Sequence, residues 1–100
     1  MSTIPVTIDF SGGSEFLVKS KEAKADFPKG STLRDVMKYV ETKLVTDTDR
    51  INMLFKPNGT EVAHGVIVLI NDTDIALLDE YNTVIEANDK ITFVSTLHGG

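Results

Sequence analysis

Apolar and polar residues alternate at the start of the chain. The apolar positions are Ile4, Val6, Ile8 and Phe10. A period of two predicts a half-buried strand over residues 4–10. Residues 11–13, Ser-Gly-Gly, then predict a turn, and residues 15–18 and 25–27 predict a second strand region that pairs back as an irregular hairpin.

The spacing of apolar residues then changes to that of a helix over residues 33–44. The apolar positions are Leu33, Val36, Met37, Val40 and Leu44. They follow the i, i+3, i+4, i+7 pattern of one helix face. Ser31 or Thr32 is the expected cap, and Asp35, three residues after Thr32, is a shortened form of the capping-box glutamate.

Three more strands are predicted over residues 51–55, 66–70 and 91–97, separated by segments rich in Asn, Asp, Pro and Gly. Strand, strand, helix and then three strands describe an α+β fold of the β-grasp type, a mixed sheet packed on one main helix. A ferredoxin-like arrangement needs a second amphipathic helix. Residues 75–81 are too few to supply it.

The predicted strand over residues 66–70 is apolar at every position, so the pattern leaves open which of its faces is buried. A sheet covered by one helix needs apolar residues only at alternate positions. Leu54 and Val94 are likewise expected to point away from their core-facing neighbours. Leu54, Val68 and Val94 are therefore a candidate partner patch. The alternative is that the long segment over residues 71–90 covers them.

Composition narrows the possible functions. The chain has 100 residues, which fits one β-grasp domain over residues 1–97 and a flexible tail over residues 98–100. A net charge of −5 argues against direct binding of nucleic acid, which needs clustered Lys and Arg. No secretory signal or apolar span long enough for a membrane is visible, so a cytoplasmic protein without membrane contact is expected.

Side chains that carry catalysis are scarce. The sequence has no cysteine, which excludes disulfides, cysteine nucleophiles and thiolate metal sites. Asp72 and Asp74 flank Thr73 but lack the further oxygen ligands that calcium needs, so Asn71 or Asp72 is interpreted as a turn residue that binds nearby backbone amides. His64 and His98 have no obvious acid or serine partner. We therefore expect no enzyme, no catalytic residue, no metal site and no bound cofactor.

The chain closes on His98, Gly99 and Gly100, beyond the predicted end of the last strand near Leu97. Three residues extend at most about 10 Å. Glycine lacks a Cβ, so such a tail could thread a narrow channel and present its terminal carboxylate inside a partner. The alternative is a frayed end without a function.

Two segments resemble the ubiquitin-related modifier family. They are Leu-Ile-Asn-Asp-Thr-Asp over residues 69–74 and Ile-Thr-Phe-Val-Ser-Thr-Leu-His-Gly-Gly over residues 91–100. The closing Thr-Leu-His-Gly-Gly is the most specific feature. The family often has a glycine where this chain has Asn88, which can adopt the same left-handed backbone conformation. Ubiquitin itself has arginines before its glycines, so its own activating enzyme is not expected to act on this chain.

The resemblance implies a function for the carboxylate of Gly100. An E1-like activating enzyme uses ATP to adenylate it, and a persulfide on the rhodanese-like domain of that enzyme converts it to a thiocarboxylate, with Leu97, His98 and Gly99 recognised as the tail. The sulfur then goes to a tRNA thiolation complex that makes 2-thiouridine at the wobble position. The activated end can also be joined to lysines of target proteins by an isopeptide bond. The rival interpretation is a noncovalent ubiquitin-fold binding module that uses only its open sheet face.

Overall fold

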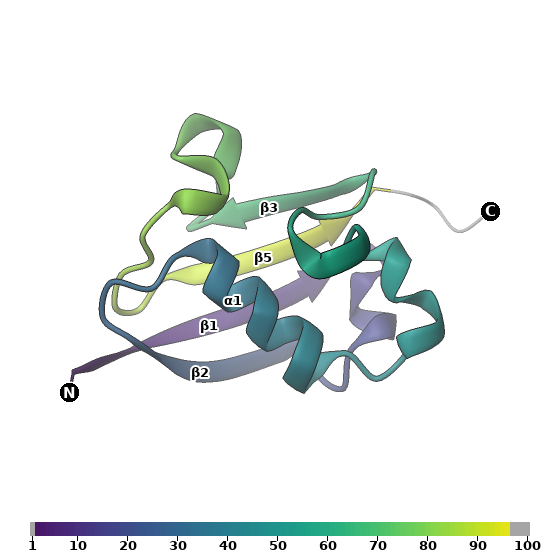
Figure 1. Ribbon diagram of the computed structural model, residues 1–100, viewed down its shortest axis with the longest axis horizontal. Helices are drawn as coiled ribbons and strands as arrows, with labels where there is room; N and C mark the ends of the chain where they lie inside the picture. Colours follow the sequence, from purple (N-terminus) through teal and green to yellow (C-terminus); the bar gives the residue numbers. More distant parts are fainter. Residues whose placement is uncertain (1, 97–100) are drawn as a thin grey trace.

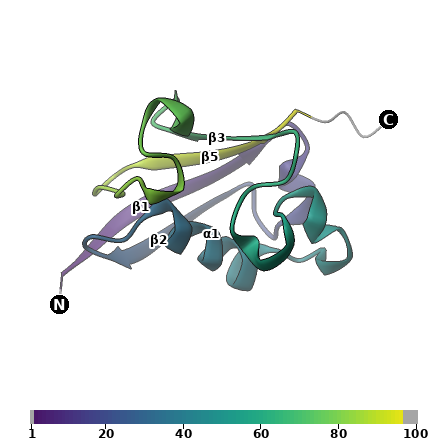
Figure 2. The same cartoon turned by 45° about the horizontal axis from the view of Figure 1, so that its top comes forward.

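The computed structural model describes residues 2–96, which form a five-stranded sheet with one main helix (Figure 1). The strands are β1 (Thr3–Ser11), β2 (Glu22–Pro28), β3 (Val66–Ile70), β4 (Thr73–Asp74) and β5 (Lys90–Ser95). Their order in the sheet is β2-β1-β5-β3-β4. The strand β1 runs antiparallel to β2 and parallel to β5, and β3 runs antiparallel to β5 and β4. The helix α1 (Leu33–Tyr39) crosses one side of this mixed sheet (Figures 1 and 2). The β-grasp predicted from the sequence is confirmed.

The alternating residues of β1 are the centre of the core. Ile4, Val6, Ile8 and Phe10 are all buried, as their spacing predicted. The hairpin with β2 is also confirmed, but the strand predicted over residues 15–18 is wrong, because η1 (Ser14–Leu17) is a short 3-10 helix. The backbone of Gly12 and Gly13 is left-handed, with φ of 70° and 117°. This turn redirects the chain away from β1, and pairing begins only at Glu22.

The predicted helix has the predicted buried face. Its five apolar positions, Leu33, Val36, Met37, Val40 and Leu44, are all buried. The N–H of Thr32 donates to the Asp35 carboxylate at 2.9 Å, as expected of a shortened capping box. The helix continues into η2 (Val40–Leu44), a π-helical turn closed by the bond from the Val45 N–H to the Val40 carbonyl oxygen (3.0 Å). That wider turn keeps Leu44 on the core side.

The strand predicted over residues 51–55 is wrong, because η3 (Thr48–Met53) is a 3-10 segment. Asp47 begins it by accepting hydrogen bonds from the Arg50 N–H (3.2 Å) and the Arg50 Nε (2.6 Å). The N–H groups of Leu54 and Phe55 then both donate to the Ile51 carbonyl oxygen at 2.9 Å. Leu54 and Phe55 are both buried, and two consecutive residues of a strand could not both face one side.

The segment over residues 71–90 contains β4 and two short 3-10 turns, η5 (Ile75–Leu77) and η6 (Glu80–Asn82), and it supplies no second amphipathic helix. The Asn71 side chain donates to the Asp89 carboxylate at 2.8 Å and accepts from the Lys90 N–H at 2.9 Å, which confirms its expected role in a turn. Asn88 is left-handed, with φ of 70°, as predicted. Within residues 2–96 no helix has both the length and the apolar character needed to cross a membrane.

Candidate functional site at the end of the last strand

The last strand, β5, lies in the middle of the sheet, and the described residues end just after it, at Thr96 (Figure 1). Ile91 and Phe93 are buried on the helix side. The ring of Phe93 stacks on that of Phe10, with centroids 5.5 Å apart, and meets the edge of Phe55 at 6.0 Å. Two flanking strands and this aromatic cluster therefore fix β5 in the core.

The last described residue, Thr96, is held against the loop before β3. Its N–H and its Oγ1 both donate to the carbonyl oxygen of Gly65, each at 2.6 Å. A carbonyl oxygen has two lone pairs and can accept both bonds. Gly65 itself is left-handed, with φ of 87°, a conformation that glycine adopts at little cost.

The other side of the same strand end is held by the turn after β1. The Oγ of Ser14, which is buried, donates to the Phe93 carbonyl oxygen at 2.7 Å and lies 2.9 Å from the Ser11 carbonyl oxygen. A Cβ placed on Gly12 would collide with the carbonyl oxygen of Ser95. We name the four residues Gly12, Ser14, Gly65 and Thr96 the exit clamp.

The tail residues of the sequence hypothesis, Leu97, His98, Gly99 and Gly100, lie outside the described residues. The structure therefore locates the point from which the tail starts, at Thr96. The sequence reasoning missed the exit clamp. The sequence around Gly12 indicates only a turn, and Ser14 contacts a strand residue 79 positions away, which no local pattern signals.

The candidate partner patch needs correction. Leu54 is 0% exposed and Val68 is 2% exposed, so neither residue can form part of a docking surface. Leu54 is buried because η3 replaces the expected strand, which removes the alternation that placed it outside. Val68 is buried because it pairs with Phe93 of β5, whose side chain faces the core. Only Val94 of the three is partly exposed.

The apolar residues on the open face of the sheet are Ile67, Leu69 and Val94, which we name the open-face patch. Ile67 lies opposite Val94 in the register of β3 and β5, and it is 38% exposed. Leu69 lies opposite Thr92, on the same face. The odd-numbered residues of β3 thus point away from the helix, which settles the face that the sequence left open. The orientation follows from the neighbouring strand, where Phe93 faces the core and is paired with Val68, and Val94 faces outward and is paired with Ile67.

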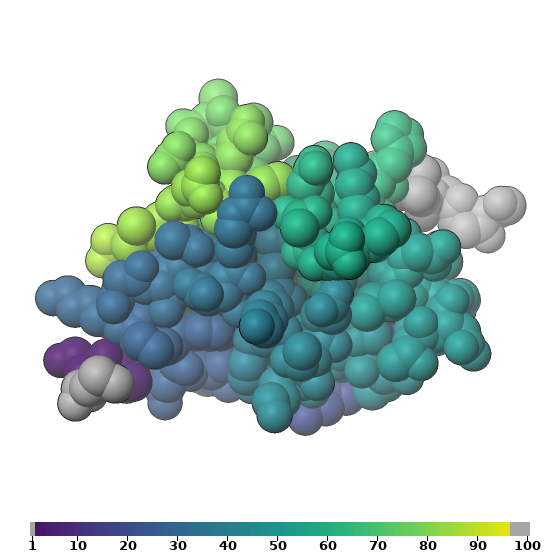
Figure 3. All heavy atoms as spheres, in the orientation of Figure 1, coloured from purple at the N-terminus to yellow at the C-terminus, as the bar shows by residue number. Residues whose placement is uncertain are grey.

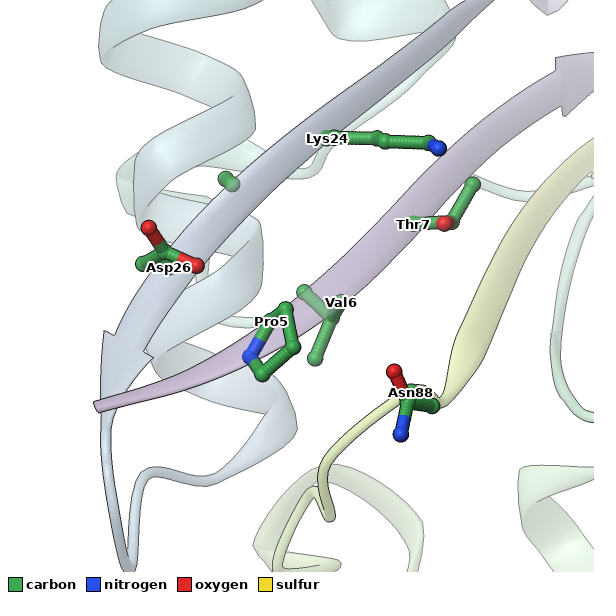
Figure 4. Close-up of a pocket in the computed structure, with 7 residues that line it drawn as sticks. Pro5, Val6, Thr7, Lys24, Asp26 and Asn88 are labelled. Atoms are coloured by element: carbon green, nitrogen blue, oxygen red, sulfur yellow. The ribbon is translucent and has the colours of Figure 1, made fainter. Parts of the chain in front are cut away.

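The open face becomes polar toward β1 and β2. A hollow of about 250 Å³ lies there, lined by Pro5, Val6, Thr7, Lys24, Ala25, Asp26 and Asn88. Figure 4 shows Lys24 extending from β2 toward β1, and Asp26 beside Pro5. The lining of this hollow contains one cation, Lys24, and one carboxylate, Asp26, but no Ser, His or Tyr that could act as a nucleophile or base.

Nowhere in residues 2–96 do three or more His, Cys, Asp or Glu side chains come together in a way that could hold a metal ion. What the described site offers is a fixed strand end beside an apolar surface. Such an arrangement suits presentation of a chain terminus to a partner.

The fold and the strand end define the chain as a small ubiquitin-like protein of the β-grasp class. Residues 5–100 match the family described as Urm1 (ubiquitin related modifier). A ubiquitin-related modifier 1 homolog of Caenorhabditis elegans is 71% identical over 100 residues, covering 100% of both chains. The chain therefore belongs to the ubiquitin-related modifier family.

Solved structures agree with this assignment. The solution structure of Urm1 from Trypanosoma brucei has a TM-score of 0.80 and 31% identity, covering 100% of both chains. The small archaeal modifier protein 1 of Methanosarcina acetivorans shares the fold, with a TM-score of 0.76, 16% identity and the same complete coverage. This chain thus belongs to a family of ubiquitin-like modifiers and shares its fold with an archaeal modifier protein.

Proposed function

We propose that this protein is a sulfur carrier and protein modifier that works through the carboxylate of Gly100. The observation that carries the proposal is that the family match runs through residue 100 and so includes the Gly-Gly end. The described fold supports it, because Thr96 directly follows a buried central strand and lies four positions before Gly100 in the sequence. The absence of cysteine leaves no side-chain thiol on which sulfur could be carried.

The chemistry begins with activation, because a carboxylate is a poor electrophile. An oxygen of the Gly100 carboxylate attacks the α-phosphorus of ATP, which forms an acyl-adenylate and releases pyrophosphate. The terminal sulfur of an enzyme persulfide then attacks the acyl carbon, and AMP leaves. A second thiol attacks the sulfur–sulfur bond, which releases the thiocarboxylate and leaves a disulfide on the enzyme. ATP and the persulfide are held by an E1-like activating enzyme with a rhodanese-like domain, and this chain is the substrate.

Two fates follow for the activated end. The thiocarboxylate donates its sulfur to a tRNA thiolation complex that makes 2-thiouridine at the wobble position. That complex holds the RNA, which is compatible with the net charge of −5 on this chain. Alternatively, the neutral amine of a target lysine attacks the acyl carbon of the acyl-adenylate, AMP leaves, the nitrogen loses a proton, and an isopeptide bond forms. Both reactions are proposed to take place in the cytoplasm.

The open-face patch is the surface that we propose for docking on the activating enzyme. It is continuous with the proposed site, because Val94 lies on β5 only two residues before Thr96. Ile67 lies beside it on β3. A partner that covers this face therefore meets the tail as it leaves the fold. The tail residues Leu97, His98 and Gly99 would then lead the carboxylate into the enzyme.

The test is to incubate the purified chain with the activating enzyme of its family, ATP and a persulfide donor, followed by intact mass measurement. The expected result is the mass gain that replacement of one oxygen by one sulfur produces. A fragment spectrum should place the gain on Gly100. An unchanged mass under conditions in which a known family member is converted would refute the proposal.

A further inference from the structure

We infer that Thr96 is a positioning residue for the reaction at Gly100, because the exit clamp fixes the point from which the tail begins. This inference rests on the proposed function and adds a role for a residue that the reaction does not touch. It concerns the distance between the docked fold and the terminal carboxylate. Thr96 sets that distance through its two bonds to Gly65.

The clamp holds the strand end from both edges. On the β3 side, the Thr96 N–H and Oγ1 share the Gly65 carbonyl oxygen at 2.6 Å each. On the β1 side, the buried Ser14 hydroxyl binds the Phe93 carbonyl oxygen at 2.7 Å, and the bare Cα of Gly12 lets the Ser95 carbonyl approach. Phe93 is 0% exposed, so the clamp is anchored to the core.

The length that remains is short. Four residues follow Thr96 in the sequence, and four extended residues span at most about 13 to 14 Å. If the Thr96 bonds were lost and the strand frayed back to Phe93, the number of residues between the last anchored position and the terminal carboxylate would rise from four to seven. The local concentration of a chain end falls roughly as the −3/2 power of that length, which is about a twofold loss.

Misplacement of the terminal carboxylate would lower the reaction rate further, beyond the loss of local concentration. The reacting atoms must approach to about 3 to 3.5 Å, and a displacement of about 1 Å can lower a rate by up to 10²-fold. A tail that starts from a fixed residue is already oriented when the fold docks. Loss of the clamp should therefore lower the rate of the bound complex, kcat, while the open-face patch still sets KM.

Three substitutions at Thr96 remove none, one or both of its hydrogen-bond donors to Gly65. Thr96→Ser keeps both donors, Thr96→Val removes only the hydroxyl, and Thr96→Pro removes the hydroxyl and the N–H together. The kinetic readout is ATP–pyrophosphate exchange by the activating enzyme, as a function of carrier concentration. We expect kcat near the wild-type value for Thr96→Ser, about twofold lower for Thr96→Val and at least fivefold lower for Thr96→Pro. KM should change by less than about twofold throughout, since the patch is untouched.

A second readout does not depend on the reaction. The Thr96 amide should be protected from hydrogen exchange in the wild-type chain, and less protected in Thr96→Val. Protection at Phe93 should persist in every variant, which shows that the sheet is intact.

Wild-type kcat for Thr96→Pro, or an unprotected Thr96 amide in the wild-type chain, overturns the inference while the proposed function stands. A change confined to KM also overturns it, since it indicates direct contact with the enzyme. Failure of the wild-type chain to be adenylated at all removes the proposed function, and the inference with it.

Discussion

Gly12 lies at a position where a residue other than glycine meets two obstacles, its backbone conformation and a neighbouring carbonyl oxygen. Its φ of 70° is costly for other residues, and a Cβ there would meet the Ser95 carbonyl oxygen. The contact is with backbone, which cannot rotate away as a flexible side chain can. The close approach of β5 to the turn after β1 therefore requires glycine at this position.

We predict that Gly12→Ala lowers the free energy of unfolding by more than about 3 kcal/mol, the upper range for left-handed strain alone. Gly30→Ala is the matched control, because Gly30 has a φ of 95° but nothing within 4 Å of its Cβ position. Its expected loss is about 1 to 3 kcal/mol. Urea denaturation of both variants decides the matter. Equal losses would show that the Ser95 contact contributes nothing.

Single residues were predictable where local chemistry decides their conformation. Asn88 could be expected in a left-handed turn, and Asn71 in a turn that binds backbone amides, because short amide side chains favour such roles. The exposure of Leu54 and Val68 could not be predicted in this way. It depends on the neighbouring element, and the uniformly apolar run from Val66 to Ile70 carries no parity of its own.

At the scale of elements, the helix is the clearest case of a pattern that specifies a structure. Its apolar stripe matches the buried face through both α1 and η2. We predict that Val40→Ala costs about 1 to 3 kcal/mol of unfolding free energy, because it removes two fully buried methyl groups. Lys43→Ala, at an exposed position of the same turn, should change stability by less than about 0.5 kcal/mol. A urea denaturation curve of Val40→Ala that matches the wild-type curve would contradict the burial of Val40 on the core-facing side of the helix.

The missed elements share a physical cause. Residues 51–55 have the composition of a strand, but the Asp47 and Arg50 pair closes a turn just before them. Local hydrogen bonds then outweigh β propensity, which is weak and depends on context. Before η1, similarly, the left-handed backbone at Gly12 and Gly13 turns the chain away from β1. The apolar residues that follow therefore do not extend the hairpin. The long periodic segments of β1 and of the helix were predictable, whereas the structure of residues 15–18 and 51–55, each preceded by a turn, was not.

At the scale of the molecule, the open sheet face and the strand end form one continuous region. We predict that Ile67→Asp raises KM for activation at least fivefold, because a charge at the patch must lose its hydration on docking. Stability should fall by about 1 kcal/mol or less, since Ile67 is on the open face. Leu77→Asp is the control, at an exposed apolar residue of η5, and its KM should be unchanged.

The result that contradicts this prediction is an unchanged KM for Ile67→Asp in a chain that remains folded by circular dichroism. The space-filling view in Figure 3 shows η5 and η6 as a separate prominence. Leu77 therefore tests whether any exposed apolar residue would behave like the patch.

The order of elements and the single covering helix were predictable because each follows from periodicity along the chain. The exit clamp was not, since it joins three segments that are distant in the sequence: the turn at Gly12, the loop at Gly65 and the strand end at Thr96. The Gly-Gly end of the sequence is the basis of the proposed tail chemistry, which stays a prediction. Only the fold shows where that tail is anchored.

The most direct measurement of the central claim is the mass of tail variants after incubation with the activating enzyme, ATP and a persulfide donor. Deletion of Gly100 shortens the tail by about 3.3 to 3.6 Å and withdraws the carboxylate from the α-phosphate, so no sulfur should be gained. Addition of an alanine after Gly100 should fail as well. Both variants should melt as the wild-type chain does. A normal gain of sulfur by the Gly100 deletion would contradict the account.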